Sequence, residues 1–387
     1  MNNTAQNIWP QAFTRPAARE LKAPLLMDAS ILVLTIILVS FSLVMVYSTT
    51  GVVAHEKYGD PLFFVKRQSA AVLLGFLGMY LCSRVRIGFL KKMAVYCLPL
   101  ALLLMVLPLV SGVGDSVGGA KRWIKFGSVG FQPGEFVKLI FVIFLCGYFA
   151  RHEDALEQFT TGLLKPFLFV ALVAGLFLLQ PDLGSCVILA IVTLGMAAAA
   201  GVCLRHVIFC FAGCGLAMAL LIMVSPYRMN RIAAFLSPFS DMQGKGYQLV
   251  QSLIAVGSGK LWGVGLGSSQ QKLFFLPAAH TDFIYAVIAE ELGFVGALAV
   301  LLVFLLFLWR GLKLAGRFVN DTFSFCLGVG LTLLIAAPAL VNMGVVLGLL
   351  PTKGLVLPLL AYGGSSLVAS LMGVGLMLAL ARSFYEE

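Results

Sequence analysis

Long uninterrupted runs of apolar residues constrain this chain more than any other feature. A helical run of about 17 residues or more can cross the hydrocarbon core of a bilayer. Only 11% of the 387 residues are charged and 60% are hydrophobic, whereas soluble domains carry about 25% charged residues. The sequence therefore predicts an all-α polytopic membrane protein, a bundle of about ten transmembrane helices. The spans are expected at residues 29–48, 69–86, 91–110, 134–150, 166–180, 183–201, 206–225, 282–309, 322–349 and 363–382.

The runs predict one transmembrane domain over residues 29–383, between a polar tail at 1–28 and a short tail at 384–387. The first tail lacks the apolar core of a signal peptide, so the first run is expected to remain as an anchor. The largest loop, residues 226–281, connects the seventh and eighth spans. All eight cysteines lie in apolar runs, without the spacing of a metal site or a disulfide framework.

The distribution of lysine and arginine predicts the orientation. With the N-terminus inside, fourteen of the 27 basic residues fall in inside segments and twelve in outside segments. The inside charges crowd short loops, which favours cytoplasmic termini and an extracytoplasmic 226–281 loop. The outside charges are either solvated loop residues or a groove that binds a phosphorylated substrate. The candidate groove residues are Arg67, Gln68, Lys121, Arg122, Arg228, Arg231 and Lys353.

Asp282 is the leading candidate for chemistry, because it lies where the long loop becomes the eighth span. A carboxylate at that depth is costly unless it is solvated, paired or used. On a continuous helix, a stripe of small residues would lie below it and allow close helix packing. Alternatively, Thr281 or Asp282 caps the helix, which is compatible with a catalytic role; His280 is expected to be a loop or interface residue. The stripe consists of Ala286, Ala289, Gly293 and Ala297.

Other charged residues are expected to support the structure. Glu290 and Glu291 lie deeper in the eighth span and are expected to pair with basic or polar neighbours. Glu135 and Lys138, three residues apart, are expected to pair at the start of the fourth span. Asp182 is expected to pair with an outer basic residue.

The segment 351–366, rich in Gly, Ser and Pro, predicts either an irregular re-entrant segment or a tight turn between spans. Ser365 and Ser366 open the tenth helix, whose first N–H groups suit an anion, and Lys353 adds a point charge. The glycine-rich run 257–267 resembles a phosphate-binding loop in composition only. It lacks the flanking strand and helix, so nucleotide binding is not expected.

One carboxylate among several cations suits glycosyl transfer from a lipid pyrophosphate better than glycoside hydrolysis. A glycosidase normally needs two carboxyl groups. Pyrophosphate leaves as a stable anion and needs neutralisation by cations. One carboxylate then suffices as the base that removes the proton of the acceptor hydroxyl. A transporter is the competing interpretation.

The motifs closely resemble those of the SEDS family (shape, elongation, division and sporulation proteins) over residues 28–383. Within that family, the run 263–277 resembles the cell-division branch rather than the elongation branch. The motifs are Met45-Val-Tyr-Ser48, Lys66-Arg-Gln68, Lys121-Arg-Trp-Ile124, Gln132-Pro-Gly-Glu135, Gln180-Pro-Asp-Leu-Gly184, Pro277 to Phe283, Glu290-Glu-Leu-Gly293, Pro351-Thr-Lys-Gly354 and Tyr362-Gly-Gly-Ser-Ser366.

The resemblance implies a peptidoglycan glycosyltransferase that polymerises lipid II into β-1,4 glycan strands during septal cell division. The reaction would occur at the outer face of the cytoplasmic membrane and release undecaprenyl diphosphate, with Asp282 as the essential acid. No cofactor is required, although a divalent cation (Mg²⁺ or Mn²⁺) at the pyrophosphate is possible. The expected partners are lipid II, the nascent glycan, a class B penicillin-binding transpeptidase (FtsI-like) and membrane proteins of the FtsQ, FtsL, FtsB and FtsN types, and no nucleic acid. A lipid II flippase and a non-catalytic scaffold of the division machinery remain the alternatives.

Overall fold

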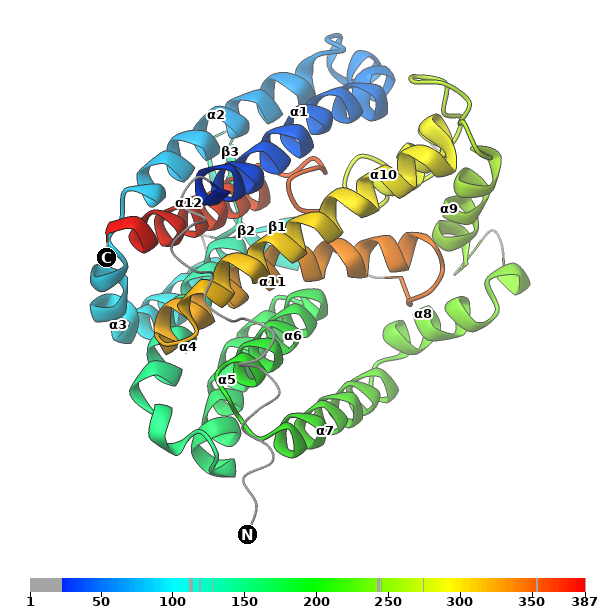
Figure 1. The fold of residues 1–387 in the computed structure, drawn as a ribbon. Helices are drawn as coiled ribbons and strands as arrows, with labels where there is room; N and C mark the ends of the chain where they lie inside the picture. The colour runs from blue at the N-terminus through cyan, green and yellow to red at the C-terminus, as the bar shows by residue number, and fades with distance from the viewer. Residues whose placement is uncertain are drawn as a thin grey trace.

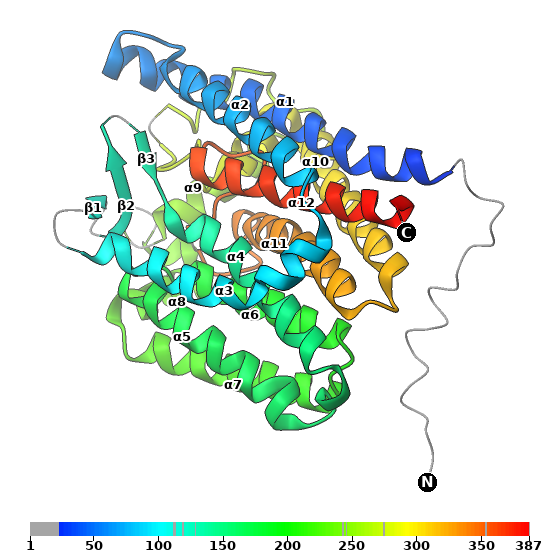
Figure 2. The same cartoon turned by 90° about the vertical axis from the view of Figure 1, so that its left-hand side faces the viewer.

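The computed structural model describes residues 23–110, 114–117, 120–127, 129–241, 244, 246–273, 275–352 and 354–386. It is a bundle of long helices that share one general direction (Figure 1), with a small sheet at one end (Figure 2). The long helices are α1 (Ala23–Tyr58), α2 (Phe63–Ser83), α3 (Ile87–Val106), α4 (Pro133–Arg151), α5 (Lys165–Leu179), α6 (Leu183–Ala199), α7 (Leu204–Met223), α10 (Ile284–Ala315), α11 (Thr322–Val346) and α12 (Gly364–Glu386). The 226–281 loop contains α8 (Pro226–Leu236) and α9 (Tyr247–Ser258).

Each of the ten predicted spans coincides with one of these long helices. Among the described residues, seven helices are long and apolar enough to cross a membrane by length and composition, and α6 and the apolar part of α7 are shorter. The molecule is thus a polytopic membrane protein, while ten crossings remain a prediction. The predicted break between the fifth and sixth spans is present, since α5 ends at Leu179 and α6 begins at Leu183.

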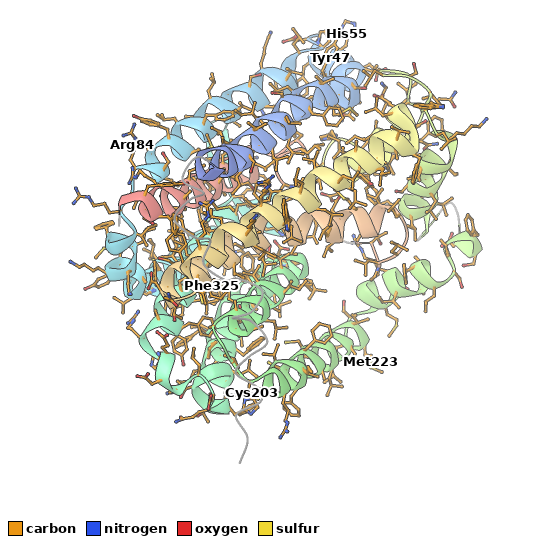
Figure 3. All side chains as sticks on the ribbon, viewed as in Figure 1. Tyr47, His55, Arg84, Cys203, Met223 and Phe325 are labelled. Atoms are coloured by element: carbon orange, nitrogen blue, oxygen red, sulfur yellow. The ribbon has the colours of Figure 1, made fainter. Side chains whose placement is uncertain are left out.

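The helices are arranged around a buried centre formed by α4 and α11. In their most apolar windows, 78% of α4 and 72% of α11 is buried. Helices α1 and α2 cover one side of this centre, and α5, α6 and α7 cover the other (Figure 2). Helix α7 is outermost: Cys203 and Met223, at its two ends, are exposed (Figure 3).

A three-stranded antiparallel sheet between α3 and α4 was not predicted. Its strands are β1 (Gly114–Val117), β2 (Ala120–Phe126) and β3 (Val129–Phe131), in the order β1-β2-β3. The alternation of β2 explains its placement, because successive side chains of a strand face opposite sides. Ile124 is buried, whereas Lys121 and Lys125 are exposed. Strand β2 therefore presents Arg122 on the same face as Ile124.

Helix α10 breaks at Gly293, which has φ of 69° and ψ of −167°. The glycine-rich run 257–267 satisfies the backbone groups freed by the break. The N–H groups of Val264 and Gly265 donate to the carbonyls of Glu290 and Glu291 at 3.0 Å each. On the far side, Phe294 and Val295 donate to the carbonyls of Lys260 and Leu261 at 2.8 and 3.2 Å. The small-residue stripe predicted from Ala286 through Gly293 to Ala297 is therefore wrong as a continuous face, because the helix does not continue through Gly293.

The segment 351–363 between α11 and α12 is irregular and largely buried, as one of the two alternatives predicted. Leu357 and Leu360 are fully buried within it. Irregular backbone at such depth needs partners for its polar groups. Two buried amide side chains, Asn342 from α11 and Gln68 from α2, supply some of them.

Candidate active site

Asp282 lies in a short turn that leads directly into α10. The N–H groups of Thr281 and Phe283 both donate to the carbonyl of Ala278, at 3.1 and 3.3 Å. Phe283 occupies the N-cap position and makes no capping bond through its side chain. The predicted capping role of Thr281 or Asp282 is therefore wrong: the Thr281 hydroxyl donates back to Ala278, at 3.3 Å.

The carboxyl group of Asp282 changes between its charged and neutral forms close to neutral pH. Burial raises its pKa to about 6, although the guanidinium groups of Arg231 and Arg122 favour the charged form, and Asp182 opposes it. Within the described ranges, the carboxylate accepts no hydrogen bond and forms no ion pair. It can therefore accept a proton from a bound molecule.

The 351–363 segment packs directly against this carboxyl group. A Cβ atom at Gly354 would lie 3.0 Å from the Oδ2 atom of Asp282. The glycine thus allows the backbone to approach the acid closely. Neighbouring Lys353, a predicted substrate-binding residue, lies outside the described residues.

Arg231 connects the long loop to the same segment. It lies on α8, and its guanidinium donates to the carbonyl of Thr352 at 3.0 Å. Its charge acts on Asp282, so two regions far apart in sequence meet at the acid. The backbone of Arg228 also lies in α8, but its side chain is outside the described part of the structure.

Arg122 is brought to Asp282 from the opposite direction, by strand β2. Its guanidinium donates to the carbonyls of Gln180 and Pro181 at 2.6 and 2.5 Å, which fixes it beside the turn between α5 and α6. Asp182 follows in that turn. It was predicted to pair with an outer basic residue, but its carboxylate instead caps α6, accepting from the N–H and hydroxyl of Ser185 at 3.1 and 2.9 Å.

Asn342, which the sequence analysis did not select, fixes the backbone of the site. Its side-chain amide donates to the carbonyl of Asp282 at 2.7 Å and to that of Leu355 at 2.6 Å. The residue is 1% exposed, on α11. It therefore joins the turn that carries the acid to the irregular segment beside it. Its signal was available, because a polar amide inside an apolar span usually has a specific partner.

Two other predicted binding residues make contacts within the protein. Gln68 is fully buried and bonds through both ends of its amide, donating to Ser42 and to the carbonyl of Ala361 and accepting from the N–H of Gly363. The Ser365 hydroxyl accepts from the N–H of Gln132 at 3.0 Å. These placements favour a role in holding the 351–363 segment over direct contact with a ligand. Ser366 beside them is half-buried.

Arg67 and Lys121 are exposed, and neither contributes to the shifted pKa of Asp282. Arg67 lies over the ring of Phe63 at 4.5 Å, at the start of α2. His280 lies in the same region, and burial lowers the pKa of its imidazole. The proposed roles of Arg67 and Lys121 at the substrate stay predictions.

The two glutamates below Asp282 have the partners predicted for them. Glu291 is fully buried and pairs with the ammonium of Lys272 at 2.8 Å, while the hydroxyl of Ser48 also donates to it. The Glu290 carboxylate accepts from the hydroxyl of Ser269 and from the N–H of Gln270. Both contacts fasten the 268–272 loop to α10 just before its break.

At the start of α4, Lys138 pairs with Glu135 at 2.8 Å, as their spacing predicted.

Carboxylates can also gather around a metal ion. In the described part of the chain, no group of three or more His, Cys, Asp or Glu residues is placed to hold a metal ion.

Comparison with known proteins identifies the family. The family of cell cycle proteins that includes FtsW, RodA and SpoVE matches residues 28–386. A probable peptidoglycan glycosyltransferase FtsW from Thioalkalivibrio sulfidiphilus is 42% identical over 378 residues, which cover 97% of this chain and 94% of the relative. The corresponding protein of Coxiella burnetii is 38% identical over 92% of this chain and 96% of its own.

Solved structures show the same likeness. A chain from a peptidoglycan synthase complex that coordinates polymerization and crosslinking is 30% identical, with a TM-score of 0.73 over 92% of this chain and 98% of that chain. The rod shape determining protein RodA of Thermus thermophilus is 29% identical, with a TM-score of 0.66 over 92% of this chain and 97% of its own. The chain therefore belongs to the FtsW/RodA/SpoVE family of cell cycle proteins, the SEDS family that its motifs resemble.

Proposed function

We propose that this chain is a peptidoglycan glycosyltransferase that polymerises lipid II and uses Asp282 as its catalytic base. The observation that carries the proposal is a single carboxyl group with a pKa of about 6, placed within the influence of two guanidinium groups. The relatives named peptidoglycan glycosyltransferase FtsW support the reaction class.

The pKa of Asp282 suits a general base that works near neutral pH. A group of pKa about 6 is roughly nine-tenths ionised at pH 7, yet it holds a proton far better than an ordinary aspartate. Asp282 takes the proton of the 4-hydroxyl of the GlcNAc of lipid II. The resulting oxygen nucleophile attacks the anomeric carbon of the MurNAc at the end of the lipid-linked glycan, and attack opposite an α-linked pyrophosphate gives a β-1,4 bond.

The leaving undecaprenyl diphosphate carries the negative charge that develops in the reaction. Arg231 and Arg122 already act electrostatically at Asp282, and planar guanidinium groups bind phosphate oxygens in pairs. We assign them the donor pyrophosphate. Arg228 belongs to α8, like Arg231, and Lys353 belongs to the 351–363 segment, so we propose both as further contacts of the pyrophosphate. Arg67, Lys121 and Ser366 are proposed as more distant contacts along lipid II and the nascent glycan.

A divalent cation at the pyrophosphate would contact Asp182, whose carboxylate also influences Asp282, while Asp282 takes the proton. Such an ion is commonly bound by one or two carboxylates together with phosphate oxygens. When bound, it would neutralise charge on the leaving group.

The partners and location follow from the same proposal. Lipid II and the nascent glycan would occupy the end of the bundle that contains Asp282, facing the outside of the cytoplasmic membrane. The synthase complex among the structural neighbours supports a transpeptidase as partner. We place both termini in the cytoplasm and the protein at the division septum, with a class B transpeptidase and the FtsQ, FtsL, FtsB and FtsN types of membrane protein.

Polymerisation by the purified protein tests the proposal. The chain is purified with its transpeptidase partner and given lipid II in detergent, and glycan polymer is separated by length. Wild-type protein should form polymer, and Asp282→Asn should form none, because the amide cannot accept the proton. Asp60→Asn is the matched control, since Asp60 is an outer carboxylate paired with Lys66 at 2.8 Å.

Each other outcome has a definite meaning. Polymer from Asp282→Asn at the wild-type rate would refute the base assignment. If the wild type forms no polymer but moves lipid II across vesicle membranes, the flippase alternative holds. If it does neither, the chain is a scaffold.

A further inference from the structure

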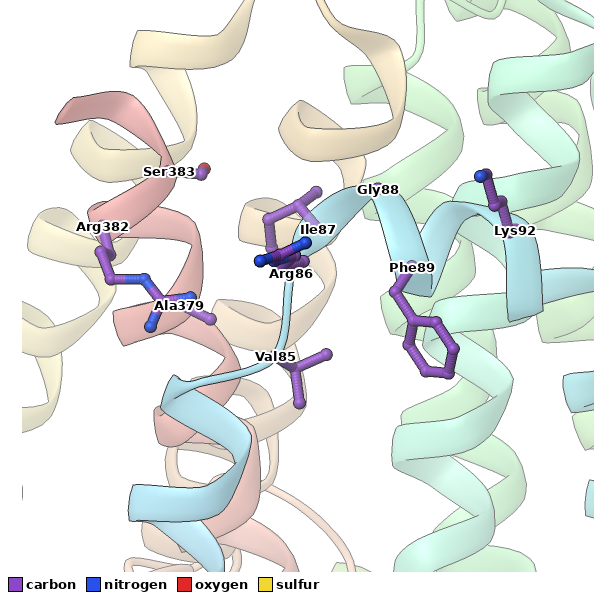
Figure 4. A pocket seen from close by; sticks show the side chains of 9 residues that line it. All are labelled: Val85, Arg86, Ile87, Gly88, Phe89, Lys92, Ala379, Arg382 and Ser383. Atoms are coloured by element: carbon purple, nitrogen blue, oxygen red, sulfur yellow. The ribbon is translucent and has the colours of Figure 1, made fainter. Parts of the chain in front are cut away.

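A cavity of about 530 Å³ lies at the end of the bundle opposite Asp282. Helices α2 and α12 both begin near the candidate active site and run roughly 30 Å before they end. The cavity lies where the linker between α2 and α3, the first turn of α3 and the last turn of α12 meet (Figure 4). None of the residues assigned to glycosyl transfer lines it.

Three cationic side chains from three elements line this cavity. Arg86 belongs to the linker, Lys92 to α3 and Arg382 to α12, and Arg86 lies between the other two in Figure 4. The described lining residues include no acid, and neither Arg86 nor Lys92 forms an ion pair within the described part of the chain. Adjacent Lys91, by contrast, pairs with Asp321 at 3.3 Å. Like charges held around one space repel, and an anion between them removes that cost.

The start of α3 adds backbone donors to the same cavity. The N–H groups of Phe89 and Leu90 both bond to the carbonyl of Arg86, and no side chain caps the helix. The N–H groups of Ile87 and Gly88, whose residues line the cavity, therefore lie at the positive end of a 20-residue helix. No atom lies within 4 Å of the position that a Cβ would take at Gly88, so the space in front of these donors is open. Helix starts of this kind bind phosphate groups.

The surface beside the cavity is apolar and exposed. Phe89 on the cavity wall is 57% exposed, and Leu77 and Leu81 on the last turns of α2 are 56% and 58% exposed. In a membrane protein such side chains face acyl chains. A ligand that fits both the cationic cavity and the apolar surface beside it has a phosphate group at one end and hydrocarbon at the other. A phospholipid has this structure.

We infer that this cavity binds the phosphate group of an anionic phospholipid from the leaflet at this end of the molecule. The phosphate would contact Arg86, Lys92, Arg382 and the start of α3, and the acyl chains would lie against α2 and Phe89. The side-chain donor of Arg382 is held in place, since its guanidinium also donates to the carbonyl of Arg84 at 3.2 Å. The site is independent of the proposed polymerase activity.

Lipid retention by the full chain tests this inference. The protein is reconstituted in nanodiscs of phosphatidylcholine and phosphatidylglycerol and then extracted into a neutral detergent. Native mass spectrometry measures the phosphatidylglycerol that stays bound. Removing two cations with the double variant Arg86→Ala/Arg382→Ala should lower this retention at least tenfold, because each basic residue near an anionic lipid contributes roughly 1 kcal/mol.

Two further variants separate binding from folding. Gly88→Asp puts a carboxylate in the open space at the helix start, which stabilises the helix but repels phosphate, so the variant should fold and lose the lipid. Lys313→Ala removes a cation that stacks on Trp309 outside the cavity and should retain it. Equal retention by wild type, the double variant and Gly88→Asp would overturn the inference. So would an equal loss in Lys313→Ala, which would indicate general surface charge.

Inorganic phosphate distinguishes the source of the phosphate group. Added during extraction, it should leave the bound phosphatidylglycerol in place, because the acyl chains add buried apolar surface. Displacement of the lipid, with inorganic phosphate retained instead, would overturn the assignment to a lipid. If the double variant loses a bound acidic protein rather than bound lipid, the assignment to a lipid would also be overturned.

Discussion

Ionising Asp282 costs this protein folding free energy, because burial disfavours the charged form. The pKa rises from its usual 3.8 to about 6 on folding, so between these values the folded state binds more protons than the unfolded state. Stability therefore falls as the pH rises through this window, and the cost is fully present above about pH 6. Its upper limit is about 3 kcal/mol. The ionised acid therefore does not contribute to the stability of the fold.

This cost gives the first prediction at the residue scale. Asp282→Asn should be more stable than the wild type at pH 7.5, and the difference should shrink as the pH falls through 6 and disappear below about pH 3, where both states of the wild type are protonated. Thermal unfolding in detergent at the two pH values measures it. Asp60→Asn, at an exposed carboxylate, should change stability by less than about 0.5 kcal/mol. A variant that is less stable at pH 7.5 would show that the carboxylate makes favourable contacts.

The same pKa predicts the pH dependence of catalysis. Polymerisation should fall about tenfold for each pH unit below about 6, because only ionised Asp282 accepts the proton. Initial rates measured at lipid II concentrations well below KM would report it, because kcat/KM follows the ionisation of the free enzyme. A rate that stays flat down to pH 4.5 would exclude a base with this pKa.

Asn342 offers a sharper test of positioning. Asn342→Leu keeps the side-chain volume but removes the donor shared by the carbonyls of Asp282 and Leu355. We expect a loss of about 1–3 kcal/mol in stability and a fall of at least tenfold in kcat, with KM for lipid II nearly unchanged. Thr332→Val is the control on α11, because among the described residues that hydroxyl donates within its own helix, to the carbonyl of Gly328. Wild-type kcat in Asn342→Leu would show that the tie is dispensable.

Residues of the site could be predicted where the sequence places a charged side chain at the edge of an apolar span, because such a charge is costly unless it is paired or used. Asp282 was selected for that reason, and Arg122 and Arg231 were selected as basic residues of outer loops; the structure brings the three together. Gln68 was selected because it follows two cations, yet its amide serves the backbone of another segment. Asn342 was missed because attention to charge passes over a neutral amide. Which backbone carbonyl an amide will reach depends on packing between distant segments.

At the scale of elements, the break in α10 at Gly293 allows the glycine-rich run 257–267 to bond to the backbone of the helix. The backbones of Gly263 and Gly293 approach so closely that a Cβ at either would overlap the other's main chain. The glycine-rich run therefore completes the hydrogen bonding of a broken helix. This role could not be predicted, because pairing between two backbones leaves no pattern in side chains.

Gly293→Ala tests the break. The alanine would adopt φ near +69°, which costs about 1 kcal/mol, and its Cβ would overlap the carbonyl of Leu261. We expect a loss of more than about 2 kcal/mol, seen as a lower melting temperature or a failure to fold. Gly257→Ala, in α9 with no atom near the new Cβ, should be neutral or slightly stabilising. An unchanged melting temperature in Gly293→Ala would indicate that α10 is continuous.

At the scale of the whole molecule, the apolar runs were sufficient to predict the helices, because a bilayer allows few alternatives. The small sheet and helix α9 were harder to predict, since polar loops carry no such constraint. The basic residues expected inside, such as Arg86, Lys92 and Arg382, gather at one end of the bundle, away from Asp282. This separation supports the proposed orientation.

Reporter fusions test that orientation. Alkaline phosphatase inserted at Gly127, in the turn between β2 and β3, should be active because it would lie outside the cytoplasmic membrane. The same enzyme inserted at Glu153, between α4 and α5, should be inactive. A green fluorescent protein fused behind Glu387 should fluoresce. The opposite pattern would reverse the topology and place Asp282 in the cytoplasm.

The contact between Gly263 and Gly293 also has a consequence for how this protein can evolve. Neither position can accept a side chain while the other backbone stays in place. A lineage therefore cannot lose the two glycines in separate, individually tolerated steps. We expect relatives to inherit the pair as one unit, and a relative that has replaced one glycine should also have replaced the other and rebuilt the loop that covers it.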